Sequence, residues 1–123
     1  MNCIFCNLPS IRIAAENELA LLFDDAYPVS PGHCLVIPRR HVSSWFEITS
    51  QEQVAMLELL VCARQRVEQT YHPSGYNIGI NDGPAAGQTV PHLHMHLIPR
   101  YLGDQIDPRG GVRFVIPEKA KYW

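Results

Sequence analysis

The sequence lacks three features that would decide its class at once: a strong excess of charge, a long apolar run and an internal repeat. Ten lysines and arginines stand against 12 aspartates and glutamates, a net charge of −2, so no general attraction to nucleic acid or to an anionic membrane is expected. The longest apolar run, VAMLELLVCA at 54–63, contains Glu58 and is too short to span a bilayer. We therefore expect neither nucleic acid nor membrane as a partner.

The N-terminus, MNCIFCNLPS, has neither the basic flank nor the apolar core of a signal peptide. We therefore expect a cytoplasmic protein. Four cysteines in a reducing compartment are not expected to form a disulfide framework, and Cys34 and Cys62 are expected to be small core residues. A chain of 123 residues is long enough for one hydrophobic core, so residues 1–123 are predicted to form a single domain.

The hydrophobic patterning predicts an α+β fold. One long helix is expected over 49–73, where Thr49 and Glu52 fit a capping box. Most connections are too short for parallel crossovers, so the sheet should be mainly antiparallel. Residues 101–123 are expected to form an extended tail on the surface. The predicted strands cover 18–25, 33–38, 75–81 and 91–99.

Three histidines occupy every second position of PHLHMHLIP, residues 91–99. Side chains alternate between the two faces of a strand, so His92, His94 and His96 should share one face. The other face should pack against the helix, and the histidine face should line a cleft or meet solvent, because buried imidazoles without partners are costly. Three interpretations are open: a polar face rich in histidine, a metal site, or nucleophilic catalysis by an imidazole.

The preceding turn, NDGPAAGQT, favours chemistry on a phosphate. Gly83 and Gly87 allow the backbone to approach a ligand closely, and exposed N–H groups in such a turn can cradle a phosphate. Gln88 and Thr89 add uncharged donors. Alone, the turn is equally compatible with a plain hairpin connection. Beside three imidazoles, it indicates a phosphate-binding site.

The stretch GQTVPHLHMHLIPR resembles the signature of the histidine triad family, His-φ-His-φ-His-φφ with φ apolar. The similarity extends to the strand that ends in acid, to PGHCLVIPRRH, to the capped helix and to NDGPAAGQTV, and it covers a common core of 1–100, with 101–123 as a C-terminal tail. It implies a sheet of about five strands packed with one long and one short helix. It also implies a homodimer whose two sheets join edge to edge. PVSPGHCLV and DGPAAGQTV are most similar to the fragile histidine triad branch, the dinucleoside polyphosphate hydrolases.

The resemblance implies an enzyme that cleaves nucleotides, purine nucleotides preferred, at the α-phosphate through a covalent nucleotidyl-histidine intermediate. His94 matches the nucleophile and His96 the histidine that contacts the α-phosphate. Gln88 matches a residue that binds the phosphate and assists the leaving group, and is the third predicted catalytic residue. The predicted substrate-binding residues are Asp25, Asn81, Gly87, Gln88, Thr89, Val90 and His96.

Asp25 leaves the substrate class open. It stands eight positions before His33, where the family has an acid or an amide that binds the ribose hydroxyls, and a carboxylate suits that role. The fragile branch usually has asparagine there, so Asp25 favours the nucleoside phosphoramidase branch instead. A nucleotide-binding regulatory protein with little catalysis is a further alternative, because binding and turnover would use the same residues.

Cys3 and Cys6 form CIFC, a C-x-x-C spacing that suits zinc. We expect no strand before residue 3, and therefore no thioredoxin-type redox motif. The resemblance to zinc-bearing members of the family implies four ligands, Cys3, Cys6, His41 and His92. Such a closed site would hold a structural zinc, and no organic cofactor is expected. The alternatives are two reduced core cysteines with an unrelated His41, or a metallohydrolase with zinc on the triad.

Three further residues have an open assignment. Phe5 and Phe23 could form an adenine pocket or belong to the plain core. His33 could support the histidine strand or be an ordinary core histidine.

Overall fold

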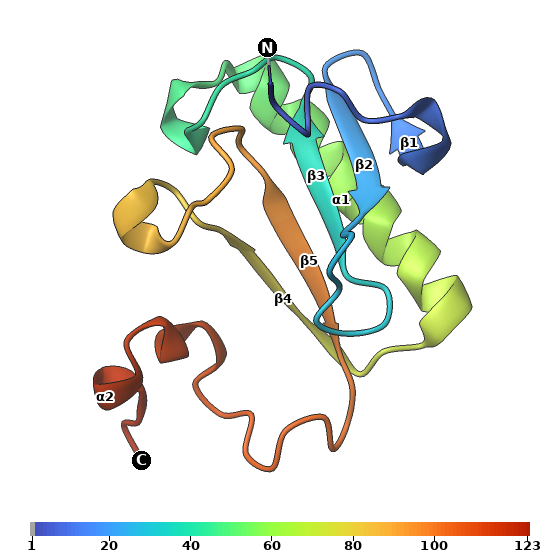
Figure 1. The fold of residues 1–123 in the computed structure, drawn as a ribbon. Helices are drawn as coiled ribbons and strands as arrows, with labels where there is room; N and C mark the ends of the chain where they lie inside the picture. Colours follow the sequence, from blue (N-terminus) through green and yellow to red (C-terminus); the bar gives the residue numbers. More distant parts are fainter. Residues whose placement is uncertain (1) are drawn as a thin grey trace.

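The computed structural model describes residues 2–123, and its centre is one five-stranded sheet with a long helix across one face (Figure 1). The strand order is β1-β2-β3-β5-β4, and every neighbouring pair is antiparallel. The α+β prediction with an antiparallel sheet is confirmed. The strands are β1 (Ile13–Glu16), β2 (Ala20–Asp24), β3 (Cys34–Pro38), β4 (Gly75–Ile80) and β5 (Met95–Arg100).

The long helix α1 (Ser50–Tyr71) begins and ends where the sequence indicates. Thr49 accepts from the Glu52 N–H while the Glu52 carboxylate accepts from the Thr49 N–H, which is the predicted capping box. Arg40 also binds Glu52, and this ion pair, with the cap, lowers the pKa of Glu52 to about 2. At the other end His72 adopts a left-handed conformation directly before Pro73. No helix within residues 2–123 is long and apolar enough to cross a membrane.

Apolar side chains cover both faces of the sheet. On the face toward α1, Leu22, Val36 and Leu97 pack with Met56 and its neighbours. On the opposite face, a smaller cluster of β2 and β3 side chains is covered by the N-terminal segment. Burial on both faces explains why HCLVIP is a nearly continuous apolar run. Cys34 is fully buried, as predicted, and Cys62 is partly buried against the same core.

The structure differs from the predicted strands in two places. Strand β1 was not predicted, and β5 begins at Met95, four residues after the predicted start. The reason for the late start is that the Leu93 N–H donates to Val42 O, outside the β3–β5 ladder. The prediction that His92 and His94 lie in a strand is therefore wrong, because both precede it. The alternation persists, since Leu93 and Met95 belong to the core while His94 lines a cleft.

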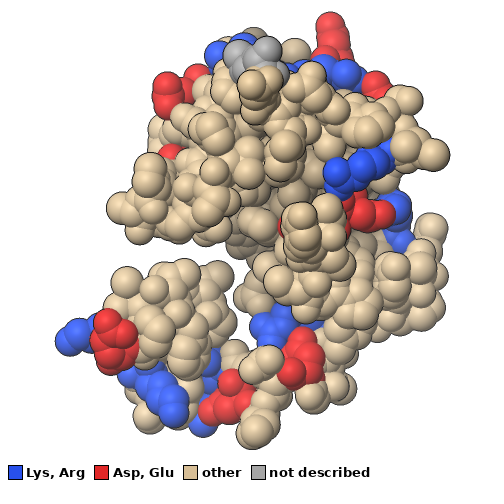
Figure 2. Space-filling model, viewed as in Figure 1, with Lys and Arg blue, Asp and Glu red and all other residues tan. Residues whose placement is uncertain are grey.

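The C-terminal segment is not simply extended. It contains a 3-10 helix (Gly111–Val115) and the short helix α2 (Pro117–Ala120). Arg109 stacks on the Trp123 ring with its guanidinium carbon 4.6 Å from the ring centroid, and Arg113 stacks on Tyr122 at 4.9 Å. In the space-filling view, the end of the tail stands apart from the sheet and helix (Figure 2).

Candidate active site

A cleft of about 410 Å³ lies beside the histidines. Its apolar wall includes Phe5 and Phe23, whose rings meet edge to face with centroids 5.4 Å apart. Such a wall next to polar groups suits a flat heterocycle. The structure brings into the cleft all but one of the residues predicted to act on substrate, namely Asp25, Asn81, Gly87, Thr89, Val90, His94 and His96.

His94 has one nitrogen committed and one available. Its Nδ1 lies 2.8 Å from His92 O, and a carbonyl oxygen only accepts, so Nδ1 carries the proton. The lone pair of the neutral ring is therefore on Nε2, which has no hydrogen-bond partner among residues 2–123. The ring is packed between Phe5 and His96, each with its centroid 5.2 Å away. The ring is thus held in place with the Nε2 lone pair uncommitted, an arrangement that suits an imidazole nucleophile.

His96 forms a pair with His33, and we call these two residues the histidine pair. His33 Nε2 lies 2.9 Å from His96 Nδ1, and 3.4 Å from the Asp25 carboxylate. The 2.9 Å separation suits a shared proton, because two nitrogens on a tetrahedral zinc would stand about 3.3 Å apart. Burial lowers the pKa of His33, and burial with the nearby His94 and His33 lowers that of His96 to about 4. Both rings are therefore neutral at pH 7.

Gln88 is the predicted catalytic residue that the structure places elsewhere. Its side-chain amide donates to Ser43 O and Val90 O, and its carbonyl oxygen accepts from the Gly83 N–H. All of these contacts hold the turn that carries Gly87 and Thr89 to the cleft, and Gln88 is not part of the cleft lining. Its direct role at the phosphate stays a prediction.

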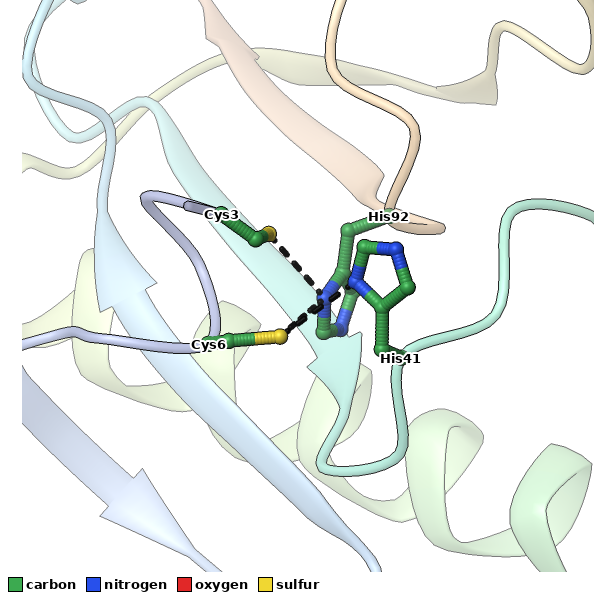
Figure 3. Close-up of side chains that lie close together, drawn as sticks. All are labelled: Cys3, Cys6, His41 and His92. Atoms are coloured by element: carbon green, nitrogen blue, oxygen red, sulfur yellow. Dashed lines mark hydrogen bonds between the residues drawn. The ribbon is translucent and has the colours of Figure 1, made fainter. Parts of the chain in front are cut away.

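Cys3, Cys6, His41 and His92 lie together, and we call them the thiol cluster (Figure 3). The sulfur–nitrogen separations are 3.6 Å for Cys3 to His92 Nδ1, 3.5 Å for Cys6 to His92 Nδ1 and 3.3 Å for Cys6 to His41 Nδ1. A tetrahedral zinc with ordinary bond lengths needs about 3.6 Å between sulfur and nitrogen ligands. Two thiols and two imidazoles at these separations fit the ion.

The tautomer of His92 also fits a metal ligand. Its Nε2 lies 2.8 Å from Pro38 O, so Nε2 carries the proton and the Nδ1 lone pair faces both sulfurs. Burial lowers the pKa of His92, which favours the neutral ring that binds metals. The His92 side chain is fully buried, and its contacts with Cys3 and Cys6 bring the N-terminal segment against the residues that lead into β5.

Sequence reasoning missed several cleft residues. Arg12 lines the cleft with its guanidinium 5.5 Å from the Phe23 centroid, and Tyr27 and Val29 come from the loop after β2. Ile4, between the two cysteines, lines the same cleft as Phe5. A lone arginine and a short loop carry no spacing signal, so only the folded chain reveals them.

The chain belongs to the histidine triad family, because the HIT domain family model matches residues 9–103. It is similar to the asymmetrical bis(5'-nucleosyl)-tetraphosphatase of Schizosaccharomyces pombe, at 41% identity over 76% of this chain and 51% of that protein. It is also similar to the adenosine 5'-monophosphoramidase hnt1 of the same yeast, at 36% identity over 81% of this chain and 75% of that protein. The family prediction is therefore confirmed, and neither branch is singled out.

The family model begins at residue 9 and so does not include Cys3 and Cys6 of the thiol cluster. A solved structure gives further information about zinc in this family. The crystal structure of a zinc-bound histidine triad family protein from Mycobacterium smegmatis has a TM-score of 0.76 and 36% identity, covering 87% of this chain and 81% of that one. This similarity confirms the HIT-like fold. It also shows that a member of the family with this architecture binds zinc.

Proposed function

We propose that this protein hydrolyses nucleotides at the α-phosphate through a covalent bond to His94. The observation that carries the proposal is the tautomer of His94, whose proton on Nδ1 is held by His92 O and whose Nε2 lone pair is left for attack in a residue that lines the cleft. Relatives in the same family bear the names of a tetraphosphatase and a phosphoramidase.

The proposed reaction has two displacements. In the first, His94 Nε2 attacks the α-phosphorus, a phosphorus–nitrogen bond forms, and the bond to the leaving group breaks with its electron pair. The ring becomes cationic, and His92 O stabilises the charge through the Nδ1 proton. In the second, water attacks phosphorus, the bond to Nε2 breaks, and the nucleoside monophosphate leaves with the release of a proton. Dividing one displacement into two lowers each barrier.

The proposed substrate is a purine nucleotide, and a dinucleoside polyphosphate is the first choice. The edge-to-face pair of Phe5 and Phe23 offers an apolar wall for the base. Asp25 lines the cleft, where its carboxylate can accept from the ribose hydroxyls. A nucleoside phosphoramidate is the alternative that Asp25 favours.

The test is the specificity constant for AMP release from diadenosine tetraphosphate and from adenosine phosphoramidate, measured side by side. A preference for the tetraphosphate supports the first choice, and a preference for the phosphoramidate replaces it with the alternative. If neither is turned over while AMP still binds, the protein is a nucleotide-binding regulatory protein and the proposal fails.

We also propose a structural zinc on the thiol cluster, held by Cys3, Cys6, His41 and His92. The sulfur–nitrogen separations and the His92 tautomer support it. The ion would supply a fixed anchor for the segment that carries His94, and no step of the reaction requires it. Thiol ligands need to stay reduced, which suits the cytoplasm.

A homodimer through the edge of β4 is the proposed assembly. Strand β4 pairs with β5 alone, at one end of the sheet. Ile78 on β4 exposes about half of its apolar side chain at this edge of the sheet, which favours a protein contact. Sedimentation of the protein and of an Ile78→Lys variant tests this: a dimer that dissociates in the variant supports it, and a monomeric parent protein contradicts it.

A further inference from the structure

His33 is buried, at 3% exposure, and each of its ring nitrogens has a partner. The Val29 N–H donates to Nδ1 with a separation of 3.1 Å. On the other side, Nε2 lies 2.9 Å from His96 Nδ1. His33 thus connects a backbone amide to a histidine that lines the cleft.

The chemistry of the Val29 amide decides where the protons lie. A backbone N–H only donates, so His33 Nδ1 has to accept and the proton of the neutral ring is on Nε2. His33 Nε2 then donates to His96 Nδ1, which leaves the proton of His96 on its own Nε2. That nitrogen has no partner among residues 2–123, and His96 lines the cleft. A phosphate in the cleft therefore meets a donor instead of a lone pair.

The loop that presents Val29 is itself fixed in place. The His33 N–H donates to Ser30 O, and the Ser30 hydroxyl donates to Pro99 O on β5 at 2.7 Å. Gly32 has a φ of +89°, and a Cβ there would come within 3.1–3.2 Å of Tyr71, Val67 and Pro99. This tight turn keeps the amide aimed at the imidazole, so its donor is preorganised.

We propose that His33 is a positioning residue that, together with the Val29 amide, holds His96 in the Nε2–H tautomer and so keeps a hydrogen-bond donor facing the α-phosphate or the leaving group. The role of that donor rests on the proposed function. Without His33, His96 can carry its proton on Nδ1 instead. The Nε2 lone pair would then face an anionic phosphate oxygen, and the two would repel each other. Asp25 Oδ2, at 3.4 Å, is the weaker of the two acceptors near His33 Nε2.

The first experiment reads the tautomers directly. Protein labelled with ¹⁵N-histidine is studied at pH 7 by long-range ¹H–¹⁵N correlation, which distinguishes protonated from unprotonated ring nitrogens. Both His33 and His96 are expected as Nε2–H tautomers, with unprotonated Nδ1. A His96 that carries its proton on Nδ1, or that exchanges equally between both forms, overturns the proposal. This result needs no variant, so a variant that fails to fold cannot obscure it.

The second experiment separates hydrogen bonding from packing. His33→Leu keeps the apolar bulk and removes the donor, whereas His33→Gln places an amide N–H₂ near the former Nε2. In His33→Leu, we expect kcat to fall by about tenfold or more, KM to change little, and His96 to lose its single tautomer. His33→Gln should restore the tautomer and most of kcat. Equal loss in both variants would mean that only the shape of His33 matters and would overturn the proposal.

The matched control is His72→Asn, which removes an exposed histidine from a left-handed position that asparagine tolerates. It should change neither the His96 tautomer nor kcat. Failure of the proposed function remains distinguishable: absence of turnover with both tautomers as expected refutes the reaction alone, while wrong tautomers with normal turnover refute the role of His33 alone.

Discussion

The thiol cluster and the histidine pair lie on either side of His94 and use the same side chain in opposite ways. In the thiol cluster, the His92 Nε2–H donates to Pro38 O, and the Nδ1 lone pair faces two sulfurs. In the histidine pair, His33 Nδ1 accepts from the Val29 amide, and the His33 Nε2–H donates to His96 Nδ1. The difference teaches that the backbone group on the far side of each ring, rather than its place in the motif, decides whether the ring presents a lone pair or a hydrogen-bond donor.

His94 connects the two clusters, and its removal should have the largest effect. In His94→Ala, we expect turnover to fall by about 10⁴-fold or more, because the proposed covalent intermediate forms on this side chain. The fold should persist, since the ring contributes little to the main core. AMP release and the thermal midpoint are the measurements. A variant that retains most of its turnover would refute the nucleophile assignment.

Loss of a thiol ligand should abolish zinc binding at the thiol cluster and leave the histidine pair intact. Purified protein is expected to contain one zinc per chain by elemental analysis, and Cys6→Ser should lose it. If free zinc exceeds Kd a thousandfold, loss of binding costs about 4 kcal/mol of the free energy of unfolding. Turnover should be kept in part, because the reaction needs no metal.

Cys62→Ser is the matched control for this prediction, because Cys62 lies on α1 outside the thiol cluster. It should keep its zinc. If Cys6→Ser loses all turnover together with its zinc, and regains turnover when zinc is added back, a metallohydrolase is favoured instead.

Acid should weaken the histidine pair through the pKa of His96. Burial and the neighbouring imidazoles lower this pKa from 6.5 to about 4 in the folded protein, so the unfolded chain binds a proton first as the pH falls. Stability from this group is complete above pH 6.5 and is lost progressively toward pH 4. Denaturant unfolding at several pH values should show that the free energy of unfolding depends less steeply on pH in His96→Asn than in the parent protein between pH 6.5 and pH 4. An equal slope in both proteins contradicts the prediction.

A change outside both clusters should have the smallest effect. Thr49→Ala removes the side-chain cap of α1 and should cost about 1 kcal/mol, roughly 4 °C in the thermal midpoint. Zinc content and kcat should be unchanged, because neither cluster contacts the cap. A loss of zinc or of turnover in Thr49→Ala would show that zinc content and kcat follow the global stability of the fold. The two clusters would then have no separate roles.

Much of the fold could be predicted because its signals are short-range. The capping box of Thr49 and Glu52 lies within four residues, and the apolar runs of β2 and β3 indicate strands by themselves. Strand β1 was missed because IAAE shows little alternation and pairs with β2 through an irregular register. The start of β5 was placed too early because the Leu93 amide binds Val42, a partner that no local pattern reveals.

The sequence predicted which residues gather at the candidate site better than it predicted what each of them contacts there. The four ligand candidates lie together, and seven of the eight residues predicted to act on substrate, His94 among them, line one cleft. Gln88 is the exception, because its side-chain amide binds backbone groups of Gly83 and Val90 in its own loop and of Ser43 in another. Arg12 and Val29 were not foreseen, because their place at the cleft depends on how the loops after Leu8 and Asp24 fold back.

The sequence by itself determined the antiparallel α+β fold, the family and the set of imidazoles and thiols available for chemistry. Only the tertiary structure decided which nitrogen of each ring carries the proton. The reason is that hydrogen bonds fix a tautomer, and the decisive partners of His92 and His96 come from segments 54 and 63 residues away. Spacing in a motif specifies which side chains meet, but the backbone behind them specifies what each one can do.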